Sequence, residues 1–407
     1  MTTQISPVKI TDRIVAIDVL RGFALLGILI MNIQGFSMPE AAYFLPTVYG
    51  DFDGVNRWVW IGSHIFADQK FMTIFSMLYG AGIILLTAKR DEREEKSAGL
   101  HYRRTFWLLV IGLAHAYLLW SGDILVTYAI CAAVVFWFRK VRPTRQLIMG
   151  ILVLLVSPLI MTGSYLSLAY APPETAAQLL EQFSPSAEKI AEQLAAYRGG
   201  WAEQMTQRVP SSLETNTGAL FFFLFWRASG LMLIGMALFK WGIFSAKRSP
   251  KFYTWMAILG FGIGLPLVIY GVLDNFAHNW DPLYSVLGPG TIPNYLGSPF
   301  VSLGYIAVIM RLVQTETFAG LQKRWAAVGR LALTNYLLQT ILATLIFYGF
   351  GLGLFGSVAR WQQLLIVFAI WLIQLAISPI WLRYFRFGPF EWLWRSLTYG
   401  RLQPMRI

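Results

Sequence analysis

The sequence predicts an all-α, polytopic membrane protein with about ten transmembrane helices and both termini in the cytoplasm. Three observations lead to this fold class. Of the 407 residues, 56% are hydrophobic and only 13% are charged, which is more apolar surface than a soluble domain could bury. Apolar runs of roughly 20 residues, the length that crosses a bilayer, recur along the chain. Lysine and arginine are concentrated in alternate connecting segments.

Ten apolar segments are read as membrane spans. The first is longer than the apolar core of a signal peptide, so we expect it to stay in the membrane. The fourth is short for a span and lies between a tight turn and a basic segment. The predicted spans are 14–36, 62–87, 104–121, 123–139, 147–169, 217–241, 253–274, 298–314, 329–350 and 361–383.

The basic residues predict the orientation of these spans. If the N-terminus is cytoplasmic, 25 of the 33 lysines and arginines fall in inner segments and only five in outer ones. This asymmetry favours both termini inside and an even number of spans. Topology and the anionic lipids of the inner surface thereby explain the net charge of +12. The basic residues are scattered over the helix ends and do not form one patch, which argues against a nucleic-acid interface.

The spans divide the chain into two membrane halves of five helices each, residues 1–169 and residues 217–407. Residues 170–216 form a periplasmic loop, the one long outer connection.

An amphipathic helix is predicted within this loop. Ser184 and Pro185 suit the N-cap and the first turn of a helix. Ile190, Leu194 and Tyr197 then follow at helical spacing among charged residues, which is typical of a helix lying on a membrane surface. This helix is either a connector that covers the ends of the spans or a lid over an outward-facing site.

The first span carries two charges, Asp18 and Arg21, in its inner third. They lie three residues apart and therefore share one helix face, where each offsets part of the cost of burying the other. The pair either orients this helix within the bundle or lines a polar cavity that opens to the inside.

The second span is the least ordinary because it contains His64, Asp68 and Lys70. His64 and Asp68 are four residues apart on one face, within reach of a histidine–carboxylate hydrogen bond that would suit general-base catalysis. The same pair could also be a solvated rim at the outer mouth of the bundle. Lys70 lies deeper in the membrane.

A second histidine–aspartate pair is predicted from spans three and four. His115 lies near the outer end of span three, and Asp123 follows the tight turn that brings span four back. The two side chains should lie at similar depth, either as a catalytic pair or as a hydrogen-bonded core contact. Arg227 in span six has no carboxylate in its own helix, so we expect an anionic ligand or Asp68 as its partner.

Polar residues also gather at the inner end of the C-terminal half. Asn335 and Gln339 lie in span nine, while Glu391 and Arg395 lie in an aromatic-rich segment near the C-terminus. Arginine beside aromatic rings suits a nucleotide that carries phosphate, and it equally suits the basic and aromatic belt of an inner leaflet. The motifs of soluble nucleotide-binding enzymes, metalloproteases and serine hydrolases are missing from the sequence. Because the four histidines and one cysteine are scattered, we expect no metal site.

Several stretches of this sequence resemble the YeiB family of bacterial inner-membrane proteins, which is defined largely by a C-terminal domain of unknown function. The resemblance covers nearly the whole chain and implies a multi-pass protein of the bacterial inner (cytoplasmic) membrane. It also implies that Lys70, His115 and Asp123 belong to the family pattern and that His64 and Asp68 do not, which favours His115 over His64 as a catalytic residue. The stretches are IDVLRGFALLGILIMNI, KFMTIFSMLYGAG, AHAYLLWSGDIL, GRLALTNYLLQTILATLIFYGFGLGLFG and GPFEWLWRSLTYG.

The start of the chain is similar to a wider superfamily of membrane acyltransferases, which includes heparan-glucosaminide N-acetyltransferase. Asp18, Arg21 and Gly22 match the motif of its first helix, and Asp68 matches an aspartate near the start of its second. The histidine that the acetyltransferase carries before this aspartate would fall near Trp58 and is absent. The resemblance implies transfer of an acyl group from cytoplasmic acyl-CoA to an acceptor on the far side of the membrane.

These observations lead to two expectations for function. The first is an acyltransferase that uses acyl-CoA as donor, with His115 as general base oriented by Asp123, and with Arg227 or Lys70 stabilising the developing negative charge. His64 with Asp68 is the second catalytic candidate. The alternative is a transporter of a small anionic metabolite. The expected partners are the lipid bilayer and a small-molecule substrate, with a homodimer as a candidate assembly.

Overall fold

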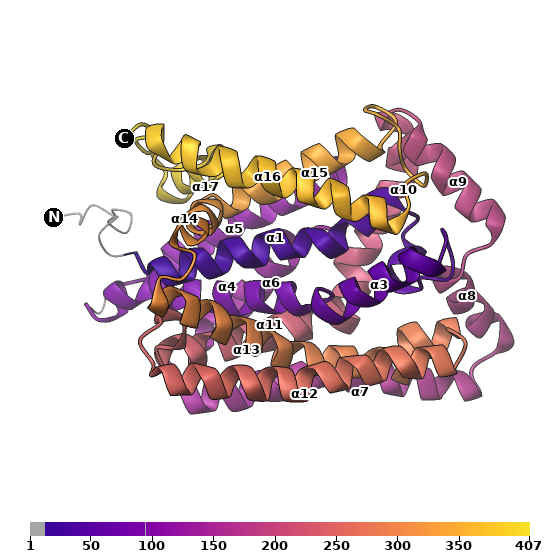
Figure 1. Ribbon diagram of the computed structural model, residues 1–407, viewed down its shortest axis with the longest axis horizontal. Coiled ribbons are helices and arrows are strands. Elements are labelled where there is room, and N and C mark those ends of the chain that lie inside the picture. The colour runs from indigo at the N-terminus through magenta and orange to yellow at the C-terminus, as the bar shows by residue number, and fades with distance from the viewer. Residues whose placement is uncertain (1–12, 94) are drawn as a thin grey trace.

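A computed structural model describes residues 13–93 and 95–407. Residues 1–12, which belong to the predicted N-terminal half, and Glu94 lie outside the described residues. The described chain folds into an elongated bundle of helices in which α1 (Val15–Ser37) runs along the middle (Figure 1). The start of α1 and the C-terminus lie at the same end of the bundle, in agreement with an even number of crossings (Figure 1).

All ten predicted spans are helical. Among the described residues, seven helices are long and apolar enough to cross a membrane, or eight if the bent pair α14–α15 counts as one span. The two remaining predicted spans are α5, which begins with a polar stretch, and the short α6. The corresponding helices are α1, α3 (Gly54–Phe66) with α4 (Lys70–Asp91), α5 (Ala98–Leu118), α6 (Leu125–Val135), α7 (Pro143–Ser167), α11 (Phe225–Lys240), α12 (Pro250–Ala277), α13 (Ile292–Thr315), α14 (Ala319–Arg330) with α15 (Ala332–Phe347), and α16 (Arg360–Tyr384).

Two spans predicted as continuous are broken. The second span divides into α3 and α4 at 67–69, where Gln69 adopts a left-handed backbone with φ of 63°. The ninth divides into α14 and α15, which meet at Leu331 with a bend of 85°. Neither break contains proline or glycine, the residues that usually mark a break in a helix.

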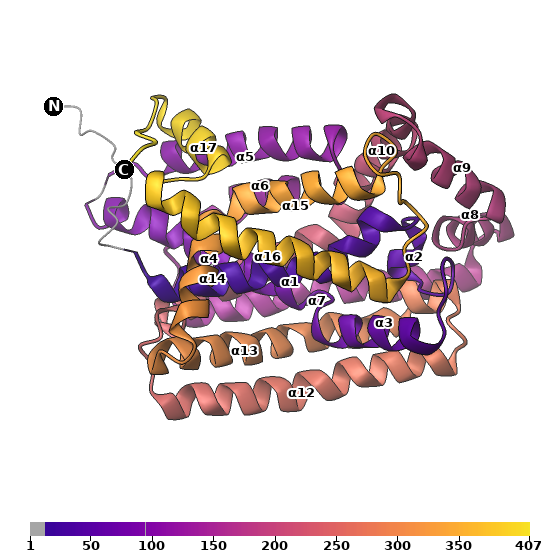
Figure 2. The same ribbon diagram turned by 45° about the horizontal axis from the view of Figure 1, so that its top comes forward.

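The outer loop forms three helices at the end of the bundle opposite the C-terminal helix α17 (Pro389–Tyr399) (Figures 1 and 2). They are α8 (Pro173–Phe183), α9 (Ala187–Arg198) and α10 (Trp201–Glu214). The N-cap of α9 is Ser186, whose hydroxyl accepts a hydrogen bond from the Lys189 amide at 3.3 Å, and not Ser184 as predicted. A π-helix over Thr215–Leu224 joins α10 to α11, so the sixth span belongs to one 40-residue helix.

Glycines allow the central helices to pack with their backbones in contact. A Cβ added at Gly80 of α4 would lie 2.0 Å from the Met232 carbonyl oxygen of α11, and one at Gly22 of α1 would lie 1.9 Å from that of Trp325 in α14. A side chain at either position would collide with backbone that cannot move aside. These small residues therefore hold α4 against α11, and α1 against α14.

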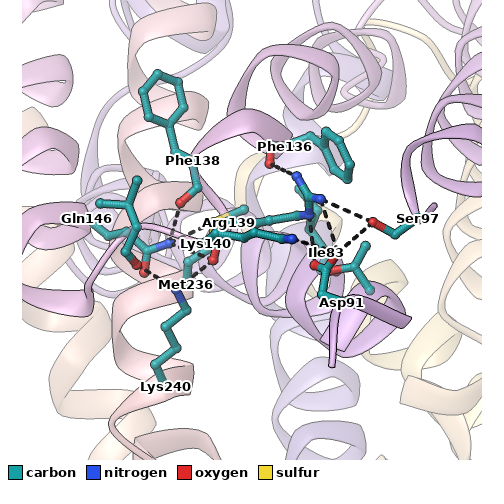
Figure 3. A network of polar contacts seen from close by, with 12 residues as sticks. Ile83, Asp91, Ser97, Phe136, Phe138, Arg139, Lys140, Gln146, Met236 and Lys240 are labelled. Atoms are coloured by element: carbon teal, nitrogen blue, oxygen red, sulfur yellow. Dashed lines mark hydrogen bonds and ion pairs between the residues drawn. The ribbon is translucent and has the colours of Figure 1, made fainter. Parts of the chain in front are cut away.

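A polar network ties together the helix ends on the side of α17 (Figure 3). Asp91, at the end of α4, accepts hydrogen bonds from Arg139 Nε at 3.0 Å and from the Ser97 hydroxyl at 2.9 Å. Lys240 of α11 donates to the Arg139 carbonyl oxygen at 2.6 Å. Burial alone would raise the pKa of the Asp91 carboxyl, but the hydrogen bonds from Arg139 and Ser97 outweigh it and lower that pKa. The network fixes the ends of α4, α6 and α11 relative to one another.

Candidate functional site

A cavity of about 1090 Å³ runs through the bundle. We call the end near α17 and the start of α1 the inner end, because the basic residues predict that it faces the cytoplasm, and the end under α8–α10 the outer end. Residues from both ends lie on the cavity wall. Of the predicted site residues, the wall includes Arg21, His64, Asp68, Asp123, Glu391 and Arg395.

At the inner end, the predicted Asp18–Arg21 contact is present and involves a third residue. Arg21 Nη1 lies 3.1 Å from Asp18 Oδ1, and Arg13 donates to both oxygens of the same carboxylate at 3.0 and 3.1 Å. Arg21 also donates to the Gly329 carbonyl oxygen at 3.4 Å, which ties α1 to the end of α14. Asp18 thus orients two arginines that line the cavity and leaves an excess of positive charge there.

Three further arginines line the inner end of the cavity: Arg104, Arg330 and Arg395. Arg104 lies over the Trp394 ring at 4.3 Å, and Arg395 over the Phe387 ring at 4.6 Å. Within the described part of the chain, none of the three guanidinium groups forms a hydrogen bond or ion pair with a carboxylate or carbonyl group, and Arg330 Nε is buried without a hydrogen-bond acceptor. Burial lowers the pKa of Arg395 to about 10, so its side chain still carries a positive charge at neutral pH.

Glu391 lies among these arginines but has a structural partner of its own. Its carboxylate accepts hydrogen bonds from the backbone amides of Leu333 and Thr334 at 2.6 and 3.0 Å, and from the Thr334 hydroxyl. These are the unsatisfied donors at the N-terminus of α15, created by the break at Leu331. Burial raises the pKa of the Glu391 carboxyl, against the opposing effect of these hydrogen bonds. Glu391 of α17 therefore caps α15.

The break between α3 and α4 brings His64, Asp68 and Lys70 together with Asn294 of α13. His64 Nδ1 lies 3.3 Å from Asp68 Oδ2, and the Asn294 amide donates to the same Oδ2 at 2.7 Å. Lys70 Nζ donates to the His64 carbonyl oxygen at 2.7 Å and to Asn294 Oδ1 at 2.6 Å. Lys70 thus satisfies a carbonyl group that the broken helix leaves unpaired, and it lies behind the cavity wall.

The His64 ring is held by stacking and keeps one nitrogen free. It stacks on Trp60 with ring centroids 4.7 Å apart. Within the described residues, no protein group forms a hydrogen bond with its Nε2, and both His64 and Asp68 lie on the cavity wall. The arrangement is that of a general base with an orienting carboxylate.

The pair His115–Asp123 is also present, in different surroundings. His115 Nδ1 lies 2.7 Å from Asp123 Oδ1, and His115 Nε2 lies 2.9 Å from the Thr340 hydroxyl of α15. Asp123 Oδ2 accepts the Val126 amide at 2.8 Å and so caps α6. The side chains of His115 and Asp123 are each 1% exposed, and His115 lies behind the wall to which Asp123 belongs.

Arg227 is fully buried and is bound by neutral groups instead of Asp68. It donates to the Thr73 and Ser298 hydroxyls at 3.0 and 2.7 Å, and to the Tyr295 carbonyl oxygen at 3.1 Å. That carbonyl lies four residues before Pro299, which has no N–H to pair with it. Arg227 therefore satisfies a backbone acceptor that proline leaves open inside the membrane.

The same arrangement recurs at two other prolines within helices. The Tyr295 hydroxyl donates at 2.8 Å to the carbonyl oxygen of Leu154, four residues before Pro158 in α7. Arg324 Nη1 donates at 2.9 Å to the carbonyl oxygen of Leu375, four residues before Pro379 in α16. The sequence signal for these roles is the position four residues before each proline, although the donor itself comes from another helix.

The remaining predicted site residues, Asn335 and Gln339, connect helices behind the cavity wall. Asn335 donates to the Ser378 hydroxyl at 3.0 Å, and Gln339 donates to Gln374 Oε1 at 3.0 Å, so both join α15 to α16. Such interhelical hydrogen bonds are typical of membrane bundles.

The outer helices close the other end of the cavity. Gln182 and Phe183 of α8 lie on its wall, as do Gln193 and Tyr197 of α9. The Tyr197 ring stacks on Phe355 with centroids 4.5 Å apart, which attaches α9 to the bundle. The loop predicted as connector or lid thus contributes directly to the cavity.

Comparison with known proteins places the whole chain in one family. Residues 238–401 match the model of DUF418, a protein family of unknown function. The chain is 32% identical to the uncharacterized protein YeiB of Escherichia coli (strain K12), over 97% of this chain and 98% of that protein. It is also 32% identical to the uncharacterized protein YxaH of Bacillus subtilis (strain 168), over 99% of this chain and 98% of that protein. The family resemblance predicted from the sequence is confirmed, and the chain belongs to the YeiB family of DUF418-containing proteins.

Proposed function

We propose that this protein transfers an acyl group from acyl-CoA, bound at the inner end of the cavity, to an acceptor hydroxyl or amine that enters from the outer end. The observation that supports this proposal is the cavity itself, whose wall carries arginines at the inner end and the His64–Asp68 pair at the helix break. A transferase that works across a membrane needs both features on one continuous space.

The charges at the inner end favour a ligand with several phosphates. Among the residues that the structure describes, five arginines lie on the wall there, and the Asp18 and Glu391 carboxylates are the only ones that lie among them. The three arginines without acceptors can each donate to phosphate oxygens, and Trp394 offers an aromatic surface for an adenine ring. CoA combines a diphosphate, a 3′-phosphate and adenine.

His64 would act on the acceptor. Its Nε2 takes the proton of the hydroxyl or amine as that nucleophile attacks the thioester carbonyl carbon. The C–S bond breaks, the acyl group remains on the acceptor, and the His64 imidazolium returns its proton to the CoA thiolate, which leaves as a thiol. Asp68 stabilises the imidazolium that forms. His115 remains the second candidate base, but Thr340 would have to release its Nε2 first.

The test combines binding with turnover. Isothermal titration of CoA into the detergent-purified chain should show binding that weakens about tenfold in Arg104→Gln and in Arg395→Gln. Arg93→Gln, an exposed arginine away from the cavity wall, is the control and should bind like wild type. Absence of binding by wild type at millimolar CoA would overturn the proposal.

A transporter of a small anionic metabolite is the second candidate, because two spans are broken, as in many secondary transporters. Acyl-CoA labelled on both the acyl group and the CoA, supplied to proteoliposomes with a membrane extract as the source of acceptor, separates the two functions. A transferase moves the acyl label to the acceptor and leaves the CoA label in solution outside the proteoliposomes. A transporter carries an intact anion across the membrane.

A further inference from the structure

A second hollow lies on the surface of the bundle at the inner end, and its wall is formed by residues of α14 and of the C-terminal part of α16. Its volume is about 540 Å³, and its wall includes Gly320, Lys323, Arg324, Pro379, Ile380 and Arg383. It is separate from the central cavity, so nothing in the proposed transfer reaction uses it.

Three cations surround this groove without compensating charge. The side chains of Lys323, Arg324 and Arg383 are exposed, and within the described part of the chain none of them has a carboxylate partner. Arg324 is held in place by its hydrogen bond to the carbonyl oxygen that Pro379 leaves open. One cation of the three is therefore positioned in advance for an anion.

The floor and the surroundings of the groove are apolar. Ile380 is 53% exposed, and on the same helix Ile377 is 49% exposed. An exposed apolar surface on a helix long enough to cross the membrane faces the hydrocarbon of the bilayer. A ligand in this groove therefore contacts apolar side chains and lipid acyl chains on one side and the three cations on the other. A free phosphate would gain nothing from the apolar floor, whereas a phospholipid fits both parts.

We propose that this groove binds the headgroup of an anionic phospholipid in the cytoplasmic leaflet. Positive grooves between helices at this side of a membrane recognise such headgroups through charge and hydrogen bonds to phosphate. The assignment to this leaflet follows from the distribution of basic residues and does not depend on the function of the central cavity.

Native mass spectrometry of the delipidated full-length chain tests the proposal. Wild type should bind phosphatidylglycerol in preference to phosphatidylethanolamine. The double variant Lys323→Gln/Arg383→Gln should lose about fivefold in phosphatidylglycerol affinity for each charge removed. Arg324 is left unchanged, since its loss would also expose the Leu375 carbonyl.

The matched control is Lys247→Gln/Lys251→Gln, which removes two exposed charges at the same end but outside the groove and should bind like wild type. Equal losses in both double variants would overturn the proposal, as would a wild type without preference between the two lipids. Displacement of the lipid by inorganic phosphate at millimolar concentration would identify a site for soluble phosphate instead and would also overturn it.

Discussion

The two histidine–aspartate pairs differ first in what surrounds the imidazole. His64 has Asp68 on one nitrogen and the cavity on the other side, while His115 has Asp123 on one nitrogen and Thr340 on the other. The first pair lies at the break between α3 and α4, and the second lies where α5, the start of α6 and α15 pack together. The buried pair has the shorter contact between imidazole and carboxylate: 2.7 Å from His115 Nδ1 to Asp123 Oδ1, against 3.3 Å from His64 Nδ1 to Asp68 Oδ2.

This difference shows that a close histidine–carboxylate contact is not by itself a sign of catalysis. An imidazole whose two nitrogens are both bonded inside a bundle holds helices together, here α5, the start of α6, and α15. An imidazole with a free nitrogen on a cavity wall can exchange a proton with a ligand. The four predictions below are ordered from the largest expected effect to the smallest.

The largest effect is expected for His115→Leu, which leaves the Asp123 carboxylate buried without its main partner. The free energy of unfolding should fall by about 3 kcal/mol, the scale for breaking a buried charged contact. Thermal unfolding in detergent measures it, with His278→Leu on the exposed outer surface as control. A His115→Leu protein as stable as wild type but inactive would reverse the assignment of the two pairs.

Next comes His64→Gln, which should reduce acyl transfer about 100-fold, the usual scale for removing a general base. The melting temperature should change little, because His64 lies beside open space. Transfer of a radiolabelled acyl group from acyl-CoA is the measurement. Full activity in this variant would exclude His64 as the base.

A smaller loss of transfer, about tenfold, is expected for Asp68→Asn. The amide still fills the space beside His64, but it no longer stabilises the imidazolium that forms as the proton is taken up. The same assay serves, with Asp51→Asn at the exposed outer surface as control. If Asp68→Asn lost as much activity as His64→Gln, Asp68 would act on the substrate directly.

The smallest change is expected for Thr340→Val, which removes one neutral hydrogen bond from His115. It should cost about 1 kcal/mol of stability and leave transfer intact. Thermal unfolding and the transfer assay together check both statements. An increase in activity would show that Thr340 restrains His115 from reaching substrate.

The sequence predicts the helical architecture well because apolar length alone sets where a span can form. The break at 67–69 was not predictable, since no proline or glycine marks it and its support comes from Lys70 and the distant Asn294. The contact of His115 with Asp123 was predictable because a tight turn connects their helices. The Thr340 contact was not, because Thr340 lies 225 residues further along the chain.

Arg227 forms no ion pair with Asp68, one of the two partners predicted for it. A buried guanidinium without a carboxylate in its helix indicated Asp68 or an anionic ligand, yet its partners are two hydroxyls and a carbonyl. The sequence contained the relevant residue, Pro299, but the pairing depends on how α11 packs beside α13. Glu391 illustrates the same point, since it caps a helix that begins at a break the sequence does not reveal.

The hydrogen bond from Arg227 to the Tyr295 carbonyl oxygen has a consequence for the evolution of positions 227 and 299. The arginine has a backbone acceptor to satisfy only as long as position 299 is proline, because any other residue there would supply its own N–H to that carbonyl. Substituting Pro299 by alanine should therefore make Arg227→Leu less harmful than it is beside the proline. Among relatives, the two positions should be exchanged together, so that a lineage that loses the proline becomes free to lose the arginine.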